Sequence, residues 1–336
     1  MSTIFVTGGA GFIGSNFIRY WLSRYPDDLV INYDLLTYAG NLENLTDVVE
    51  KHSDHYVFIK GDINNYELVL HLFKHYKPDY VVNFAAESHN SRAVMNPEIF
   101  YQTNVLGTQR LLQAAKDAEV PRFHHISTCE VYGDLPLDSG ESFAETSPYR
   151  PRTPYNSSKA AADLAVRAYY ETYHLPVTIS NCCNNYGPHQ FPEKLIPYFT
   201  IRALRGSKMT LYKSSRNKRE WLHVDDHCEG IDLTLKKGKV GETYNIGSGV
   251  EADIETVADL ILDVLGLDQS YKSYVEDRPG HDRRYLLDST KIRSELGWKP
   301  KTPFEKGFGE TVLWYKENQS WWEPLLARLD IDEGKW

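Results

Sequence analysis

The sequence predicts an α/β protein: a doubly wound parallel sheet followed by a smaller α/β C-terminal domain. Three observations support this prediction. Short apolar runs alternate with amphipathic helical patterns, a glycine-rich loop joins the first run to the first helix, and polar residues directly follow several of the runs. Such alternation indicates right-handed βαβ units, whose ligands bind beyond the carboxyl ends of the strands.

The first unit carries the signature of a dinucleotide-binding loop. A predicted buried strand over 3–7 is followed by the loop and helix start that contain Gly8, Gly11, Phe12, Ile13 and Gly14. Glycines at this spacing allow a tight turn, a close approach of the backbone to a pyrophosphate and close helix packing. The free N–H groups of the helix start then face the phosphates. This unit predicts a Rossmann-type dinucleotide site.

The second predicted strand, over 29–33, ends in Asp34, twenty residues after Gly14. A carboxylate at this place can accept hydrogen bonds from both ribose hydroxyls. Leu35 and Leu36 follow it and supply no arginine for a 2′-phosphate. The sequence therefore favours NAD over NADP as the cofactor.

The next units place further candidates around the same cofactor. The strand predicted over 56–60 leads into Asp62 and Ile63, where a carboxylate could bind the adenine amino group. The strand predicted over 79–84 leads into small residues that let the backbone lie against the cofactor, and the helix predicted over 99–118 adds a polar residue. These candidates are Ala85, Ala86, Ser88 and Thr103.

The candidate catalytic residues follow the strand predicted over 123–126 and open the helix predicted over 155–173. Thr128, Cys129 and Glu130 follow the strand, while Tyr155 and Lys159 lie one helical turn apart on one face. An ammonium group beside a phenol stabilises the phenolate and lowers its pKa from about 10. Tyr155 is therefore predicted to act as a general base toward a hydroxyl group. A sixth strand is predicted over 176–181.

Composition excludes several classes of partner. The chain has 336 residues, 41% of them hydrophobic and 25% charged, with a net charge of -9 and a pI near 5.8. A nucleic-acid or membrane-surface partner would require a basic face, so neither is expected. The four cysteines show no CxxC spacing, the first strand begins almost at Met1, and no apolar run is long enough to cross a membrane. We expect a soluble cytoplasmic protein.

Two basic runs and two histidine pairs stand outside the predicted sheet. Arg219 precedes Trp221 and Arg278 precedes a Pro-Gly pair, so both guanidinium groups are candidates for binding a diphosphate. The pairs His71/His75 and His223/His227 have a spacing that can bind zinc, but neither has the glutamate of an HExxH motif, and no metal is expected.

Taken together, these motifs resemble the extended short-chain dehydrogenase/reductases, and within them the nucleotide-sugar 4,6-dehydratases that act on dTDP-glucose. The resemblance runs nearly end to end and is most specific in 85–89, 184–197, 221–227, 241–247 and 278–284. It implies an NAD-binding domain over 1–188 and about 220–248, and a nucleotide-sugar-binding domain over about 189–219 and 249–336. It also implies a homodimer.

The resemblance assigns roles as well. Tyr155 would take the proton of the sugar 4-hydroxyl, with Thr128 bonded to O4 and Lys159 lowering the pKa of Tyr155 and holding the nicotinamide ribose. Glu130 would remove the C5 proton, and the hydride would return to C6 to give a 4-keto-6-deoxy sugar. Asn185 would contact the cofactor. The nucleotide-sugar contacts would come from Ser88, Thr128, Asn184, Lys194, Leu195, Tyr212, Arg219, Asn245, Asp253, Arg278 and His281.

The chain departs from this family around the reacting carbons. Cys129 stands where the family has an aspartic acid, and His89-Asn90-Ser91-Arg92 replaces His-Val-Asp-Arg. A thiol of pKa about 8.5 is mostly neutral at pH 7 and can donate a proton without tuning, although it is a weak acid.

Two other activities on the same scaffold therefore stay open: a 5,6-dehydratase that forms an exo-glycal, and a UDP-glucuronate decarboxylase. A non-catalytic NAD-binding protein would be expected to lack the Tyr-Lys pair or Glu130. Both are present, so an enzyme is favoured.

Overall fold

The large sheet of the protein is parallel and has seven strands. The computed structural model describes residues 1–213, 215–276 and 282–329. The strand order is β10-β6-β5-β4-β1-β2-β3, so the direction of winding reverses between β1 and β4, where doubly wound sheets bind their ligands. The strands are β1 (Thr3–Thr7), β2 (Leu29–Asp34), β3 (Tyr56–Lys60), β4 (Tyr80–Asn83), β5 (Phe123–Thr128), β6 (Val177–Cys182) and β10 (Thr243–Ile246). The predicted fold class is confirmed.

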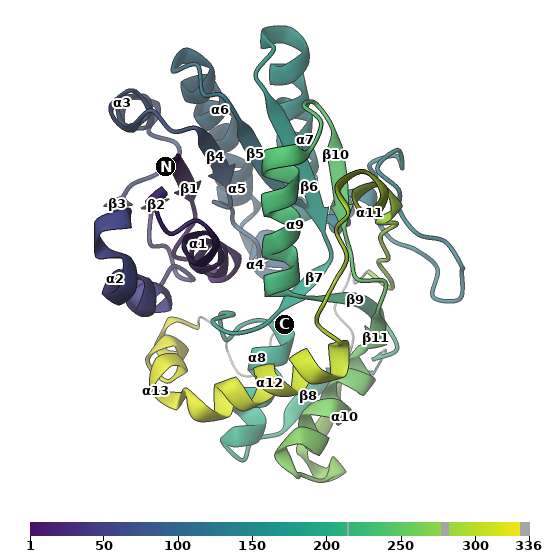
Figure 1. Cartoon of the computed structure of the whole chain (residues 1–336). Coiled ribbons are helices and arrows are strands. Elements are labelled where there is room, and N and C mark those ends of the chain that lie inside the picture. The colour runs from purple at the N-terminus through teal and green to yellow at the C-terminus, as the bar shows by residue number, and fades with distance from the viewer. Residues whose placement is uncertain (214, 277–281, 330–336) are drawn as a thin grey trace.

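Helices cover both faces of this sheet (Figure 1). One face packs against α1 (Phe12–Arg24) and α9 (Val224–Lys237), which bury Phe17 and Ile231 in one hydrophobic core. The other face packs against helices that bury Phe73, Leu111 and Val166 in a second core. These helices are α3 (Tyr66–Tyr76), α6 (Thr108–Asp117) and α7 (Pro154–Tyr173).

The helix predicted over 99–118 is confirmed as an unbroken helical run, but its middle is π-helical, which the sequence did not predict. The segment consists of α5 (Pro97–Phe100), a π-helical stretch η3 (Tyr101–Gly107) and α6. Within η3, the Asn104 amide accepts from the Glu87 N–H at 2.8 Å and donates to the Glu87 carbonyl at 3.0 Å. Asn104 Nδ2 also lies 2.8 Å from Ser158 Oγ on α7. The widened turn thus ties the loop after β4 to the catalytic helix, as π-bulges at functional sites often do.

A second lobe lies below the large sheet in Figure 1 and has its own core around Phe199, Ile261 and Phe308. It contains a three-stranded sheet of β7 (Asn184–Tyr186), β9 (Lys218–His223) and β11 (Glu251–Asp253), and a pair of β8 (Met209–Tyr212) and β12 (Lys272–Val275). Its helices are α8 (Leu195–Leu204), α10 (Ile254–Leu265), α12 (Phe304–Glu317) and α13 (Gln319–Trp322). The domain boundaries expected from the sequence stay a prediction.

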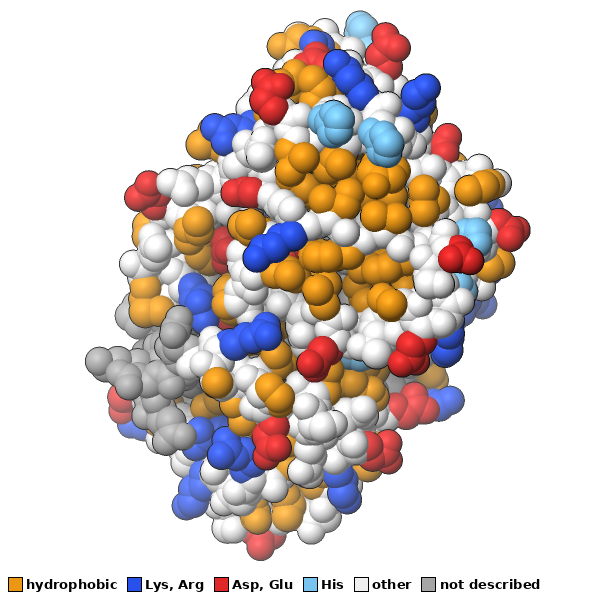
Figure 2. Space-filling view, turned by 90° about the vertical axis from the view of Figure 1, so that its left-hand side faces the viewer, with side chains coloured by type: hydrophobic (Ala, Val, Ile, Leu, Met, Phe, Trp, Pro, Cys, Tyr) orange, Lys and Arg blue, Asp and Glu red, His pale blue; other side chains and the backbone are white. Residues whose placement is uncertain are grey.

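The side of the molecule that carries β3, α2 (Thr46–His52) and α3 exposes the edge of the large sheet. Hydrophobic side chains gather in the middle of this face (Figure 2). Val57 and Ile59 of β3 are only partly covered by the core behind them. None of the helices within the described ranges is both long and apolar enough to span a bilayer.

Candidate active site

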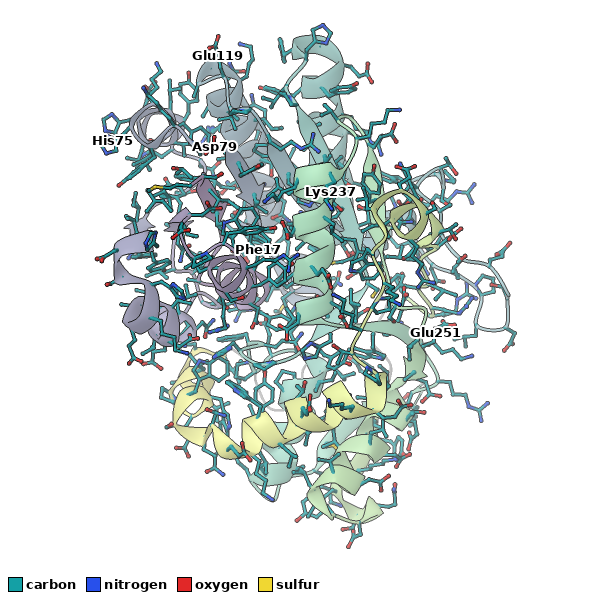
Figure 3. The ribbon with its side chains drawn as sticks, in the orientation of Figure 1. Phe17, His75, Asp79, Glu119, Lys237 and Glu251 are labelled. Carbon is teal, nitrogen blue, oxygen red and sulfur yellow. The ribbon has the colours of Figure 1, made fainter. Side chains whose placement is uncertain are left out.

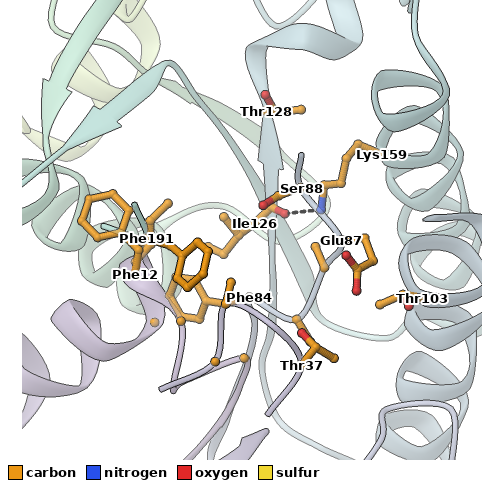
Figure 4. Close-up of a pocket in the computed structure, with 18 of the residues that line it drawn as sticks. Phe12, Thr37, Phe84, Glu87, Ser88, Thr103, Ile126, Thr128, Lys159 and Phe191 are labelled. Atoms are coloured by element: carbon orange, nitrogen blue, oxygen red, sulfur yellow. Dashed lines mark hydrogen bonds between the residues drawn. The ribbon is translucent and has the colours of Figure 1, made fainter. Parts of the chain in front are cut away.

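A cavity of about 320 Å³ follows the carboxyl ends of the central strands and extends toward the second lobe. Figure 4 shows part of its lining, with Thr128 and Lys159 near Ser88 and Glu87. The structure brings the expected cofactor and catalytic residues together at this place. The predicted residues that line it are Gly8, Gly11, Phe12, Ile13, Gly14, Asp34, Asp62, Ile63, Ala85, Ala86, Ser88, Thr103, Thr128, Cys129, Glu130, Tyr155, Lys159, Asn184, Asn185 and Lys194.

The glycine loop is packed too tightly for side chains. Gly8 has a φ of 68°, and a Cβ there would lie 2.6 Å from the backbone nitrogen of Ala85. A Cβ on Gly14 would lie 2.3 Å from the carbonyl oxygen of Gly8. The loop therefore leaves bare backbone at the start of α1, which is what a pyrophosphate requires.

Asp34 ends β2 at the edge of the same cavity. Its Oδ2 accepts from the Ala10 N–H at 2.9 Å and its Oδ1 from the Leu36 N–H at 2.7 Å. The pKa of Asp34 is raised overall by burial, and these two hydrogen bonds offset part of that rise. The carboxylate is held in place by backbone groups alone and lies where a ribose can reach it, so the donor set fits an adenine dinucleotide.

Lys159 is buried beneath the cavity. Its Nζ donates to the Ile126 carbonyl at 2.6 Å and lies 3.3 Å from Nε2 of His125 (Figure 4 shows the first of these bonds). Burial lowers the pKa of Lys159 to about 8, and the nearby carboxylate of Asp163 opposes this shift. The ammonium form therefore predominates at pH 7.

Tyr155 does not show the lowered pKa that the sequence predicted. Burial raises the pKa of its phenol well above 10, and the charge of Glu130 adds to this effect. A hydrogen bond with Thr128 acts in the opposite direction. Lys159, whose ammonium group donates to the Ile126 carbonyl, is not among the main influences on this pKa.

His125 lies next to Lys159, and its tautomer follows from the hydrogen bonds of its neighbours, a feature that the sequence did not reveal. The Thr7 hydroxyl oxygen accepts from the Ala85 N–H at 3.3 Å, so its proton goes to Asn83 Oδ1 at 2.6 Å. Asn83 Nδ2 must then donate to Nδ1 of His125, 3.2 Å away. The imidazole, whose pKa burial lowers well below 6.5, therefore carries its single proton on Nε2.

Asp163 lies behind this imidazole, one turn after Lys159 on α7. Its Oδ1 is 3.5 Å from Nε2 of His125, and its Oδ2 accepts from the hydroxyls of Ser127 at 2.8 Å and Tyr149 at 2.9 Å. Burial raises the pKa of Asp163 to about 6, while the charge of Lys159 lowers it. The i, i+4 spacing from Lys159 was the one sequence signal that could have revealed this residue.

Cys129 and Glu130 lie at the start of the short helix η4 (Cys129–Tyr132) that follows β5. Burial raises the pKa of the Cys129 thiol well above its usual range, so this residue is neutral. Burial also raises the pKa of Glu130, but the Asn90 amide, which donates from Nδ2 to Oε2 at 2.9 Å, lowers it. The sequence marked Asn90 as a departure from the family without giving it this role.

Several expected substrate contacts do not line this cavity. Asn245 is fully buried, and its amide is bonded to Tyr132 and to the carbonyl of Phe143, so it is a structural residue in this fold. Asp253 caps α10 by accepting from the Thr256 N–H at 2.7 Å. Leu195 and Tyr212 lie at the start of α8 and the end of β8.

Of the two arginines expected at the diphosphate, Arg219 lies within the described residues and Arg278 does not. Arg219 Nη2 donates to the Asp282 carbonyl at 2.8 Å, and its guanidinium lies over the ring of Tyr285, 4.8 Å from the ring centre. Arg278, like His281, lies outside the described residues.

The histidine pairs do not form a metal site with other residues in the described parts of the chain, where no group of three potential ligands comes together. The rings of His71 and His75 are stacked 6.4 Å apart on α3, and Figure 3 shows His75 on the outer side of the molecule. His227 is completely buried, and burial lowers its pKa to about 3.

The fold and this cavity define an enzyme of the doubly wound class that works with an adenine dinucleotide. Residues 5–311 match the family described as GDP-mannose 4,6 dehydratase. The chain is 47% identical to the dTDP-glucose 4,6-dehydratase of Xanthomonas campestris pv. campestris (strain B100) over 346 residues, covering 97% of this chain and 96% of the relative.

Solved structures agree. The dTDP-glucose 4,6-dehydratase DesIV from Streptomyces venezuelae, with NAD bound, superimposes with a TM-score of 0.92 at 50% identity, over 96% of this chain and 99% of DesIV. The corresponding enzyme of Bacillus anthracis, in complex with NAD, gives a TM-score of 0.90 at 47% identity, over 97% of this chain and 100% of that enzyme. The chain therefore belongs to the GDP-mannose 4,6 dehydratase family, and the resemblance in its sequence is confirmed.

Proposed function

We propose that this protein is an NAD-dependent nucleotide-sugar 4,6-dehydratase that converts dTDP-glucose, or a close nucleotide hexose, to the 4-keto-6-deoxy sugar. The observation that carries the proposal is the convergence of Thr128, Glu130 and Tyr155 on the cavity that also contains the glycine loop and Asp34. The relatives at high identity and coverage are dTDP-glucose 4,6-dehydratases. Their names favour neither the exo-glycal-forming nor the decarboxylating alternative.

The cofactor site is supported by residues along the whole cavity. Bound NAD supplies a hydride acceptor at its nicotinamide ring and returns the hydride later in the same cycle. Asp34 would hold the adenosine ribose, and Lys159 the nicotinamide ribose. The remaining cofactor contacts would come from Gly8, Gly11, Phe12, Ile13, Gly14, Asp62, Ile63, Ala85, Ala86, Ser88, Thr103 and Asn185.

The first proton transfer would be from the sugar 4-hydroxyl to Tyr155, with Thr128 as a hydrogen-bonding partner. The 4-hydroxyl of the sugar donates its proton to the Tyr155 oxygen, which needs to be ionised to accept it. Thr128, which hydrogen-bonds the phenol, would steady the sugar oxygen and the phenolate together. Within the protein itself, the hydrogen bond with Thr128 is the interaction that lowers the pKa of the phenol, so it would favour the phenolate.

The second stage belongs to Glu130 and Cys129. A ketone at C4 acidifies the C5 proton, so the Glu130 carboxylate can remove it. The thiol of Cys129 would then give its proton to the departing C6 hydroxyl, which leaves as water, and the thiolate regains a proton before the next turnover. Since burial raises the pKa of this thiol, we expect the loss of water to be slower than with a carboxylic acid.

Binding of the nucleotide diphosphate would rely on local cations because the chain is acidic overall. Lys194 and Asn184 line the cavity, with Leu195 next to them. Arg219 would reach the diphosphate from β9, and Tyr212 and Asp253 lie in the same lobe. The resemblance adds Arg278 and His281, which lie outside the described residues.

We also propose a homodimer and a reducing, cytoplasmic setting. Large apolar side chains are exposed on the helices around α7: Met95 at 75%, Leu106 at 51% and Leu164 at 60%. The short helices α4 (Asn90–Met95) and α5, and the π-helical η3, all pack against α7, so this exposed surface is continuous enough for a second copy. All four cysteines are free and buried, as expected in a reducing compartment.

The test is turnover of a panel of dTDP-, UDP- and GDP-sugars by the purified enzyme, followed by mass spectrometry. Loss of one water from dTDP-glucose, with the alkaline absorbance of a 4-keto sugar, is the expected result. Loss of carbon dioxide from UDP-glucuronate, or a product that retains a 4-hydroxyl beside a 5,6 double bond, would contradict the proposal.

A further inference from the structure

We propose that Asn90 is the positioning residue of the catalytic base, fixing one oxygen of Glu130 and leaving the other for the substrate. Asn90 opens α4 and Glu130 follows β5, so forty positions of sequence separate the two. Asn90 Nδ2 donates to Glu130 Oε2 at 2.9 Å. Among the described residues, this is the one side-chain hydrogen bond that Glu130 receives. The inference rests on the proposed function, because it assigns Glu130 the role of base.

The orientation of the Asn90 amide is determined by its other neighbour. The Thr153 hydroxyl oxygen accepts from the Asn156 N–H at 3.2 Å and so caps α7. Its proton is then free to go to Asn90 Oδ1, 2.8 Å away. With Oδ1 accepting from Thr153, the end of the amide that faces Glu130 is the NH₂ group, which can only donate.

A donor fixed in this way favours the ionised form of Glu130, since a carboxylate accepts and a protonated carboxyl group would gain less from it. The charge of the base is therefore stabilised at one oxygen, while Glu130 itself lines the cavity. Thr153 also caps α7, the helix that carries Tyr155. The Asn90 amide therefore connects Glu130, the proposed base for the C5 proton, to the helix of Tyr155, the proposed base for the 4-hydroxyl proton.

Other groups around Glu130 act in both directions. The charges of Arg219 and Lys194 lower its pKa, while the carboxylate of Asp282 raises it. The neutral groups near it belong to Cys129, Tyr155 and Tyr285. Within this set, Asn90 is the hydrogen-bonding group, so its removal should act on Glu130 directly and should leave the two cations in place.

The variant Asn90→Ala tests the inference. Exchange of the C5 proton with deuterated solvent should fall by about tenfold on the acid limb of its pH profile, since hydrogen bonds to charged groups have roughly that effect on an equilibrium. Formation of reduced cofactor in a single turnover of the holoenzyme should change little, because it depends on Tyr155 and Lys159. The acid limb of the exchange profile should move to higher pH. An equal fall in both steps with an unchanged acid limb would overturn the proposal.

The pKa of Glu130 can also be measured without any turnover. The carboxylate infrared band of the holoenzyme, assigned by its loss in Glu130→Gln, should titrate at higher pH in Asn90→Ala than in the wild type. Equal values would refute the role of Asn90 even if the sugar substrate had been chosen wrongly. A wild-type enzyme inactive on every sugar, with a raised Glu130 pKa in the variant, would contradict the proposed function and leave the positioning role supported.

Three control variants separate this effect from general damage. Thr153→Val removes the hydroxyl that orients the amide and should reproduce part of the shift, whereas Thr153→Ser keeps the hydroxyl and should restore the wild-type profile. Asn65→Ala removes an asparagine cap from α3, where its side chain accepts from the Leu68 N–H, and should leave the Glu130 titration unchanged. If Thr153→Ser shifted the profile as far as Thr153→Val, the orientation argument would be wrong.

Discussion

Replacement of Asp163 by asparagine should narrow the pH range in which the enzyme works, through its effect on Lys159. Asp163 is completely buried, and its charge is the main group that raises the pKa of Lys159 against the effect of burial. With pKa values of about 6 for Asp163 and about 8 for Lys159, both groups are charged between those two values. Asparagine keeps the shape and the bonds to Ser127 and Tyr149 but removes the charge.

The expected change in the pKa of Lys159 follows from the distances between these groups. Lys159 Nζ lies 3.3 Å and Asp163 Oδ1 lies 3.5 Å from the same atom, Nε2 of His125. Opposite charges at most about 7 Å apart interact by roughly 2 to 3 kcal/mol at an effective dielectric constant of about 20, which is about two pKa units. The pKa of Lys159 should therefore fall to about 6, and about nine-tenths of the enzyme would have a neutral lysine at pH 7.

The assay is the pH dependence of kcat/KM for the sugar substrate. In the wild type, activity should decline as the pH rises through about 8, where Lys159 loses its proton. In Asp163→Asn, this decline should begin about two pH units lower, with activity reduced roughly tenfold at pH 7 and more at pH 8. An alkaline limb that stays near its wild-type position would refute the reasoning, whatever the loss of activity. Asp232→Asn is the matched control, since that carboxylate accepts from Tyr20 and Tyr25 between α1 and α9.

Three further predictions test the other parts of the site. Cys129→Asp should speed loss of water severalfold at pH 7 in a mass-spectrometric assay, and loss of activity would show that the thiol has its own role. Gly14→Ala should weaken NAD binding by tenfold or more in calorimetry, because its Cβ would lie 2.3 Å from the Gly8 carbonyl, whereas Gly140→Ala, with nothing within 4 Å, should bind normally. Leu164→Glu, at a side chain 60% exposed on α7, should yield monomers in light scattering, and an unchanged mass would disprove the proposed interface.

The parts of the site that the sequence predicted are those encoded by contiguous motifs. The glycine loop, the carboxylate that ends β2 and the pair Tyr155/Lys159 each depend on spacing within one strand-helix unit, and all line the cavity. The parallel sheet then brings the strand ends together. Local sequence patterns were enough to find these residues, because the topology of the sheet then brings them to one cavity.

What the sequence could not provide depends on burial and on contacts between distant segments. The hydrogen bond from Asn90 to Glu130 joins α4 to η4, which follow different strands, and no spacing in the sequence predicts it. The raised pKa of Tyr155 comes mainly from desolvation, which only packing determines. Asn245 lies in a conspicuous motif, yet its amide is used inside the protein.

This chain has Cys129 where the resemblance implies an aspartic acid, and the burial of this position determines the consequence. Burial raises the pKa of a carboxyl group and so brings a strong acid toward neutrality, where it can donate a proton to a leaving hydroxyl. The same burial raises the pKa of a thiol, which is already neutral, and makes it a poorer donor. The departure of the hydroxyl therefore becomes the harder half of the elimination. The hydrogen bond from Asn90, which lowers the pKa of Glu130 against the effect of burial, would then matter more, because an ionised Glu130 can form the carbanion at C5 ahead of the slow step. Under the proposed mechanism, the departures from the family at 90 and 129 would act on the two halves of one reaction.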